Sequence, residues 1–142
     1  MTFARNKYEQ LQDEHEKLEG MAKDLDIQGH HVAQEALRLH KACPGAAVGE
    51  YITKYREFLE LNSVYRKQVK TFQTRAQIVN NLSIQISEDL KPDPTQPVVK
   101  ADRLKRTLLL KIAKDQIVWL ENIKKLNENI DSEEKLALSK LV

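Results

Sequence analysis

The stretch from residue 48 to residue 90 reads VGEYITKYREFLELNSVYRKQVKTFQTRAQIVNNLSIQISEDL, and its pattern decides the fold. Mostly apolar residues recur in it at alternating steps of three and four. They are Val48, Tyr51, Tyr55, Phe58, Asn62, Tyr65, Val69, Phe72, Ala76, Val79, Ser83, Ile86 and Leu90. A seven-residue period places one stripe along an α-helix, and the stripe is stable only when another helix covers it. The stretch therefore predicts a long helix in a bundle or coiled coil.

A second stretch, upstream of the first, repeats the same spacing. Its positions are Tyr8, Leu11, His15, Leu18, Ala22, Leu25, Gly29, Val32, Ala36, Leu39 and Cys43. Large residues alternate there with small ones, which predicts that a neighbouring backbone comes unusually close between Ala22 and Ala36. Since both stretches carry an inward stripe, we expect Leu18 and Phe72 to lie in a common core.

The composition supports long helices in a single domain. At 142 residues the chain is large enough to bury a core without disulfides or structural metals. Charged residues make up 31 % and aromatic residues 6 %, which is typical of solvated helices rather than of a sheet. The formal charge of +2 is too small to predict nucleic-acid binding by itself.

Breaker residues set the ends of the first two helices, which we expect over about residues 3–42 and 47–90. The pair Pro44-Gly45 separates them, because proline disfavours helix at the preceding residue and glycine supplies the turn. At a rise of 1.5 Å per residue, each helix is about 60 Å long. Asp26 and Gly29 are poor helix formers, so the first helix is either continuous or kinked near them.

The third helix follows a corner with three prolines in residues 91–97 and is expected over about residues 101–130. After it, Asp131 and Ser132 either cap a last short helix over residues 132–142, or the third helix continues to the end. The third helix carries a wide apolar face, which predicts that it lies in the groove between the other two. This face consists of Leu104, Leu108, Leu109, Ile112, Ala113, Ile117, Trp119, Leu120, Ile123, Leu126 and Ile130.

Two short corners between helices of similar length predict an elongated, antiparallel three-helix bundle or coiled coil of the all-α class. Its plan is similar to that of spectrin-type repeats with longer helices, a resemblance of periodicity alone. Charge favours this arrangement, since acids dominate the first half of the first helix while the second helix has none from residue 61 to residue 87. The basic residues expected to face these acids are Arg66, Lys67, Lys70 and Arg75.

The sequence contains no recognisable catalytic, cofactor or metal motif. Its four glycines form no phosphate-binding loop, and the Glu-x-x-His pairs of a di-iron bundle are missing. The adjacent His30 and His31 diverge on a helix, which leaves His31 and Glu35 as a candidate metal pair at i and i+4. We therefore expect no enzyme, no cofactor and no metal site. His15 and Asn62 lie on the stripes, where buried polar residues select one alignment of the helices.

Beside its main stripe, the second helix has another flank spaced three and four. It contains the partner-binding candidates Leu61, Val64, Ile78 and Leu82, interrupted by Gln68, Thr71 and Arg75. A flank that is half apolar and half polar resembles an interface more than a dry core. Either the third helix covers it all, or Val64 and Ile78 stay exposed to receive a partner helix.

Two further segments are candidates for binding. Basic residues gather at the start of the third helix, opposed only by Asp102; they are Lys100, Arg103, Lys105, Arg106, Lys111 and Lys114. The patch is either a solvated face or a surface for acidic protein, phosphoinositide headgroups or nucleic acid. The proline loop matches the polyproline spacing that SH3-type grooves bind, through Lys91, Pro94 and Pro97, or it is simply a stiff corner.

The cellular compartment is indicated by a single cysteine and by the lack of membrane signals. Cys43 lies in an apolar stripe, so we expect a small buried residue in a reducing compartment. No run of eighteen apolar residues predicts a membrane span, and the N-terminus lacks the pattern of a signal peptide. We expect a cytosolic chain, either intact or the N-terminal part of a longer protein.

Together these patterns favour a non-enzymatic protein–protein interaction module, a scaffold or adaptor subunit of a cytosolic complex built on coiled-coil helices. The alternative is an elongated helical module that docks on an anionic membrane surface or nucleic acid through the basic start of the third helix. Steep loss of binding with salt would favour the alternative. The stripes do not decide between a monomer, a homo-oligomer and a subunit of a hetero-complex.

Overall fold

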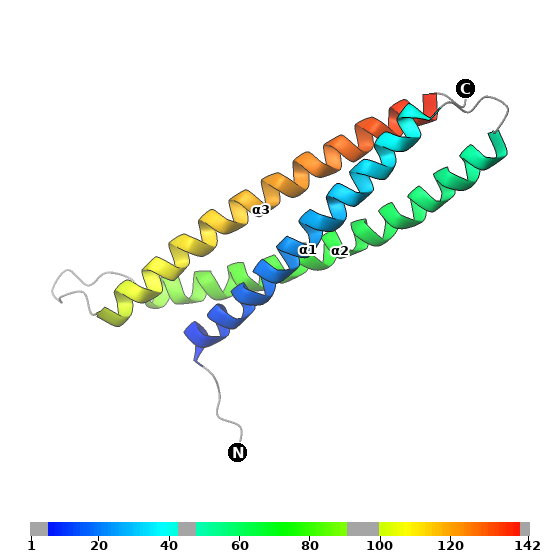
Figure 1. Ribbon diagram of the computed structural model, residues 1–142. Coiled ribbons are helices and arrows are strands. Elements are labelled where there is room, and N and C mark those ends of the chain that lie inside the picture. Colours follow the sequence, from blue (N-terminus) through cyan, green and yellow to red (C-terminus); the bar gives the residue numbers. More distant parts are fainter. Residues whose placement is uncertain (1–5, 43–47, 91–99, 140–142) are drawn as a thin grey trace, which may run out of the picture.

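A computed structural model describes residues 6–42, 48–90 and 100–139, and within them the chain forms three α-helices (Figure 1). They are α1 over Lys7–Lys41, α2 over Val48–Asp89 and α3 over Lys100–Ser139. The predicted all-α bundle is thus confirmed. Figure 1 shows α1 and α3 running in the same direction and α2 returning between them in the chain order, which is the predicted up-down-up course.

The first helix is capped at Asn6 and is not interrupted. Asn6 caps it, because the Oδ1 atom of Asn6 accepts a hydrogen bond of 2.8 Å from the backbone N–H of Glu9. The predicted start near residue 3 lies outside the described residues; Asn6 is extended, and α1 begins at Lys7. Helix α1 continues through Asp26 and Gly29, so the predicted alternative of a break near them is wrong.

Of the two arrangements predicted after residue 130, the structure has the continuous third helix, and no separate helix starts at residue 132 within the described residues. Asp131 and Ser132 lie inside α3, which continues to Ser139. The reason is packing, since Ile123, Ile130 and Ala137 continue one buried stripe at seven-residue spacing. Burying the last of these residues stabilises the helix across a sequence that resembles a cap.

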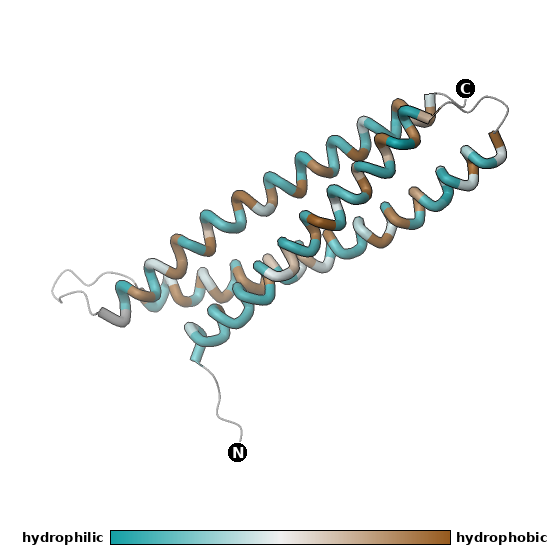
Figure 2. Tube along the Cα trace, in the orientation of Figure 1, coloured by the Kyte–Doolittle hydropathy of each residue, from teal (hydrophilic) through white to brown (hydrophobic). Residues whose placement is uncertain are grey.

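The core follows the predicted stripes of α1 and α2. Every predicted inward position of α1 from Leu11 to Leu39 is buried, and Leu18 and Phe72 are completely buried. Figure 2 shows the corresponding alternation of apolar and polar segments along each helix. The buried residues of α2 are Tyr51, Phe58, Tyr65, Val69, Phe72, Ala76, Val79 and Ile86. Tyr55, Asn62 and Ser83 are half-buried, and Val48 is exposed.

Helix α1, not α3, is the central element. It packs along its length against both other helices, whereas α2 and α3 touch each other much less. Figure 1 shows the second half of α1 between α3 and the first half of α2. The prediction that the third helix lies in the groove between the other two is therefore wrong. Four residues of its wide apolar face are exposed as a result: Leu104, Ala113, Ile117 and Leu120.

The small residues of α1 admit side chains from both neighbours. At Gly29 an added Cβ atom would lie 2.8 Å from Leu126 Cδ1 of α3 and 2.9 Å from Tyr65 Oη of α2. Real Cβ atoms do not approach other atoms so closely, because attraction is optimal near 3.5–4.0 Å and turns to repulsion below it. The space beside Gly29 is thus filled by side chains of both neighbours at the centre of the bundle, and the predicted close approach of a neighbouring backbone stays a prediction.

Candidate functional surfaces

The flank of α2 predicted from its second stripe is not covered by α3. Val64 is 44 % exposed and Ile78 is 41 % exposed, while Leu61 and Leu82 are half-buried against the core. We call the residues Leu61, Val64, Gln68, Thr71, Arg75, Ile78 and Leu82 the α2 flank. Complete cover by the third helix, one of the two predicted arrangements, is therefore wrong. The flank's role in binding stays a prediction.

Two hollows lie beside the α2 flank, and residues of α1 and α2 alone line them. The larger, of about 480 Å³, has the apolar side chains of Leu39, Phe58 and Leu61 and a charged edge that includes Arg38 and Glu57. The smaller, of about 200 Å³, is lined by Met21, Asp24, Leu25, Gln68 and Thr71. The groove between α1 and α2 is thus apolar along its floor and carries both signs of charge at its edges.

The expected charge pairing between α1 and α2 occurs at one of the four basic residues. Arg75 lies 3.4 Å from Glu14 of α1. Arg66 instead reaches α3, where its guanidinium lies 2.8 Å from Asp131, and it also donates to the half-buried Asn62. The predicted pairing of Arg66 with α1 is therefore wrong. Asn62, predicted as a buried residue, is half-buried, and its amide oxygen accepts a hydrogen bond from the arginine that joins α2 to α3; its role in alignment stays a prediction.

The basic patch divides into residues with different surroundings. Arg106 is half-buried and donates a hydrogen bond of 3.2 Å to the carbonyl of Leu90, the residue that follows the end of α2. Arg103, Lys111 and Lys114 are exposed, and none of them forms an ion pair with a described residue. The side chain of Lys100 lies outside the described residues, as does the whole proline loop with Lys91, Pro94 and Pro97.

Three of the histidines make polar contacts that join or brace the helices. His15 is buried and hydrogen-bonded, as predicted for a register residue: its Nε2 lies 3.0 Å from Asp115 Oδ2, and its ring stacks on Trp119. His40 Nδ1 lies 2.6 Å from Glu133 Oε2. Both pairs join α1 to α3. His30 bonds within α1, to the carbonyl of Asp26 at 2.7 Å.

The candidate pair of His31 and Glu35 lines the larger hollow together. Glu35 forms an ion pair of 2.6 Å with Arg38, and His31 is exposed. Over residues 6–42, 48–90 and 100–139, no group of three or more His, Cys, Asp or Glu side chains is placed to hold a metal ion. Cys43 lies outside the described residues.

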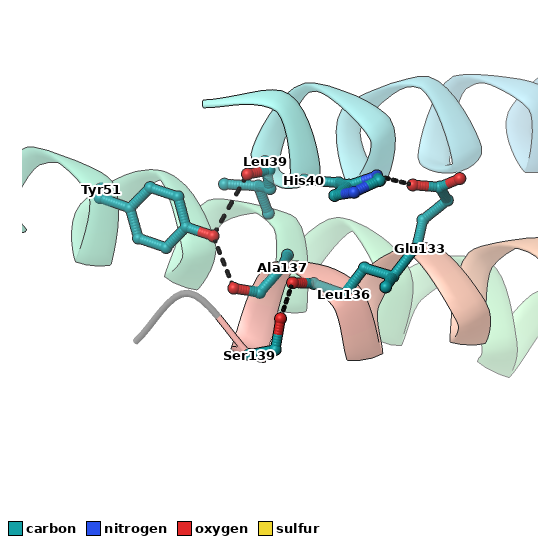
Figure 3. A network of polar contacts seen from close by, with 7 residues as sticks. All are labelled: Leu39, His40, Tyr51, Glu133, Leu136, Ala137 and Ser139. Atoms are coloured by element: carbon teal, nitrogen blue, oxygen red, sulfur yellow. Dashed lines mark hydrogen bonds and ion pairs between the residues drawn. The ribbon is translucent and has the colours of Figure 1, made fainter. Parts of the chain in front are cut away.

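Two tyrosines of α2 form hydrogen bonds to the other helices at the end of the bundle where α1 and α3 end and α2 begins. Figure 3 shows the hydroxyl of Tyr51 near two backbone carbonyls, Leu39 O at 3.2 Å and Ala137 O at 2.9 Å. One turn later, Tyr55 donates to Glu134 at 3.0 Å. The sequence showed these tyrosines only as members of an apolar stripe, because their partners lie 79 and 86 residues away.

Burial perturbs the ionisation of these tyrosines. It raises the pKa of Tyr51, and it also raises the pKa of Tyr65, whose hydroxyl has no hydrogen-bond partner among the described residues. Burial, with the hydrogen bond to Glu134 adding to it, raises the pKa of Tyr55 to about 12. Burial thus favours the neutral form of all three phenols in the folded protein.

No helix of the described chain has an apolar stretch long enough to cross a bilayer. Comparison of the sequence with protein-family models and curated proteins, and of the structure with solved structures, finds no match. The arguments for a function therefore rest on the surfaces described above.

Proposed function

We propose that this protein is a non-enzymatic interaction module, a scaffold or adaptor subunit of a cytosolic complex, that binds a helical segment of a protein partner along α1 and α2. The observation that carries the proposal is the exposure of Val64 and Ile78, on a flank whose three-and-four spacing is that of a helix–helix interface. Spacing of this kind is typical of residues on which another helix packs, and in the bundle both residues remain exposed.

The neighbouring groove supports the same kind of partner. Its apolar floor at Leu39, Phe58 and Leu61 suits the anchor residues of an amphipathic helix, which recur at i, i+3, i+4 and i+7. Its edges carry both signs of charge, as at Arg38 and Glu57, so the partner helix would present both acidic and basic side chains beside its apolar stripe. The cytosolic assignment is supported by the single cysteine in the sequence.

The test replaces both exposed apolar residues by lysine, as Val64→Lys with Ile78→Lys. Because both side chains are exposed, the melting temperature should change by less than about 3 °C, which corresponds to under about 1 kcal/mol. A partner captured by the parent chain and then purified should bind this variant at least about tenfold more weakly, since two apolar contacts are lost.

A matched control carries the same two lysines elsewhere on α2. Leu59 and Ile84 are also exposed, and they lie on other faces of the helix. The variant Leu59→Lys with Ile84→Lys has the same charge and should bind the purified partner like the parent. The proposal is refuted if the flank variant binds as the parent does, or if the control loses binding equally. Unfolding of the flank variant would show that Val64 and Ile78 are internal.

A further inference from the structure

The outward side of α3 combines basic and apolar residues that the bundle does not use. We call the residues Arg103, Leu104, Leu110, Lys111, Lys114, Ile117 and Val118 the α3 outer face. Its four apolar side chains are between 54 and 65 % exposed, and they include two of the three most exposed large hydrophobic residues in the described chain. The three basic side chains are exposed and form no ion pair with a described residue.

These residues form one continuous surface. At 100° per residue they occupy about 140° of the helix, on the side opposite the buried residues Ile112, Gln116 and Ile123. Leu110 and Ile117 lie seven residues apart on one edge, and Leu104 and Val118 lie on the other edge with Lys111 between them. The surface is about 22 Å long at 1.5 Å per residue.

Charge is distributed unevenly between this segment and the rest of the chain. Residues 103–120 contain five of the 23 basic residues and one of the 21 acidic residues, so the remaining chain is slightly acidic. The single acid, Asp115, is directed toward α1, where it bonds His15. The α3 outer face therefore contains no acidic residue that could neutralise its two lysines and its arginine. The next acidic residue along α3 is Glu121, which lies 3.7 Å from Lys125.

The shape of the surface selects among anionic partners. A partner helix docks in a groove with a narrow apolar stripe, whereas the α3 outer face is the convex side of one helix. Nucleic acid would use the basic residues but would leave four apolar side chains in water, and no exposed aromatic residue lies among the charges to stack on bases. A second copy of the chain would bring like charges together.

An anionic lipid bilayer can bind both the apolar and the basic side chains of the α3 outer face. Apolar side chains on a helix that lies flat in the interface are buried about 5–10 Å into the boundary of headgroups and acyl chains. Lys and Arg beside them extend to the headgroups, where each contributes about 1 kcal/mol on an anionic surface. We propose that the α3 outer face docks the protein peripherally on an anionic lipid bilayer. This inference does not rest on the proposed function, because the surface lies on α3 and the partner groove lies between α1 and α2.

The experiment measures flotation of the full chain with vesicles of phosphatidylcholine alone and with about 30 % phosphatidylserine, at about 0.1 M and about 0.5 M salt. We expect binding to the anionic vesicles only, and weaker binding at the higher salt. Arg103→Glu with Lys111→Glu and Lys114→Glu should lower the partition coefficient by on the order of a hundredfold, at about fivefold per basic residue lost. Arg106 is left unchanged because it bonds to α2.

A second variant separates insertion from simple charge attraction. Leu110→Ser with Ile117→Ser keeps every charge and should weaken vesicle binding by at least about tenfold, because two exposed apolar side chains no longer enter the interface. The matched control is Ile27→Ser with Ile84→Ser, which removes two exposed apolar residues from α1 and α2 and should bind vesicles like the parent. Far-ultraviolet circular dichroism verifies that each variant is folded.

The charge variant also has a control. Lys67→Glu with Lys70→Glu and Lys135→Glu gives the same net charge from three other exposed lysines and should keep most of the binding. No binding to anionic vesicles at low salt, or equal loss in both charge variants, would overturn the inference. It would also be overturned if duplex DNA bound the chain tightly and Leu110→Ser with Ile117→Ser left both DNA and vesicle binding unchanged, since the face would then act through charge alone.

Discussion

Replacing Gly29 with alanine sets two effects of opposite sign against each other. At an open helical position the exchange stabilises by up to about 1 kcal/mol, because glycine loses more backbone entropy on folding than alanine does. At Gly29, however, the added Cβ atom would lie 2.8 Å from Leu126 Cδ1 and 2.9 Å from Tyr65 Oη. Favourable contacts begin near 3.5 Å, so both side chains would have to move by roughly half an ångström or more.

The two side chains differ in how easily they can move. Leu126 lies at the edge of the core and can adjust its terminal methyl group, whereas the ring of Tyr65 is completely buried. Overpacking a core in this way destabilises by about 1–3 kcal/mol, which exceeds the gain in helix propensity. We therefore expect Gly29→Ala to lower the free energy of unfolding by about 1 kcal/mol and the melting temperature by about 3 °C.

The control is Gly20→Ala, on the exposed side of the same helix, where no atom lies within 4 Å of an added Cβ. This variant should be more stable than the parent by about 0.5–1 kcal/mol. Urea unfolding followed by circular dichroism measures both. If Gly29→Ala stabilises as much as Gly20→Ala, the helices do not approach as closely as described. Adding Tyr65→Phe, which removes the contacting hydroxyl, should recover part of the loss.

Two further predictions concern the core and the buried phenols. Phe72→Asp buries an unpaired charge and should lower the free energy of unfolding by several kcal/mol, against under about 0.5 kcal/mol for the outward change Lys17→Gln; an unchanged melting temperature in the Phe72 variant would contradict the core assignment. Because the pKa of Tyr55 is raised to about 12 in the folded protein, its neutral form contributes stability that is complete below pH 10 and is lost as the pH rises from 10 to 12. Tyr55→Phe should flatten that alkaline decline in urea unfolding, and an unchanged slope would show that the phenol is not protected.

The sequence by itself determined the inward faces of α1 and α2. Every predicted position of α1 from Leu11 to Leu39 is buried, and so are the large stripe residues of α2 from Tyr51 to Ile86 except the half-buried Tyr55. The prediction was possible because a helix converts spacing along the chain directly into position around its axis. The same spacing identified the flank with Val64 and Ile78, but it did not show whether the third helix covers that flank.

Helix ends and the polar contacts between helices depended on packing instead. The Asp131-Ser132 pair resembles a cap, but Ile130 and Ala137 are buried on one stripe, and α3 passes through it. Arg66 was expected to face the acids of α1, yet it bonds Asp131 of α3. Local signals of this kind contribute about 1 kcal/mol each, so tertiary contacts readily override them.

Only the tertiary structure decided which helix is central and which surfaces are therefore free. The wide apolar face of α3 predicted that this helix lies between two neighbours, but the width of an apolar face does not determine how many helices pack on it. In the structure α3 packs mainly on α1. Helix α1 packs against both other helices, and at Gly29 the missing side chain leaves room for Tyr65 of α2 and Leu126 of α3. Since α3 packs mainly on α1, Leu110 and Ile117 stay in solvent beside Lys111 and Lys114. Their spacing places these residues on one side of a helix, but only the packing of the helices shows that this side is open.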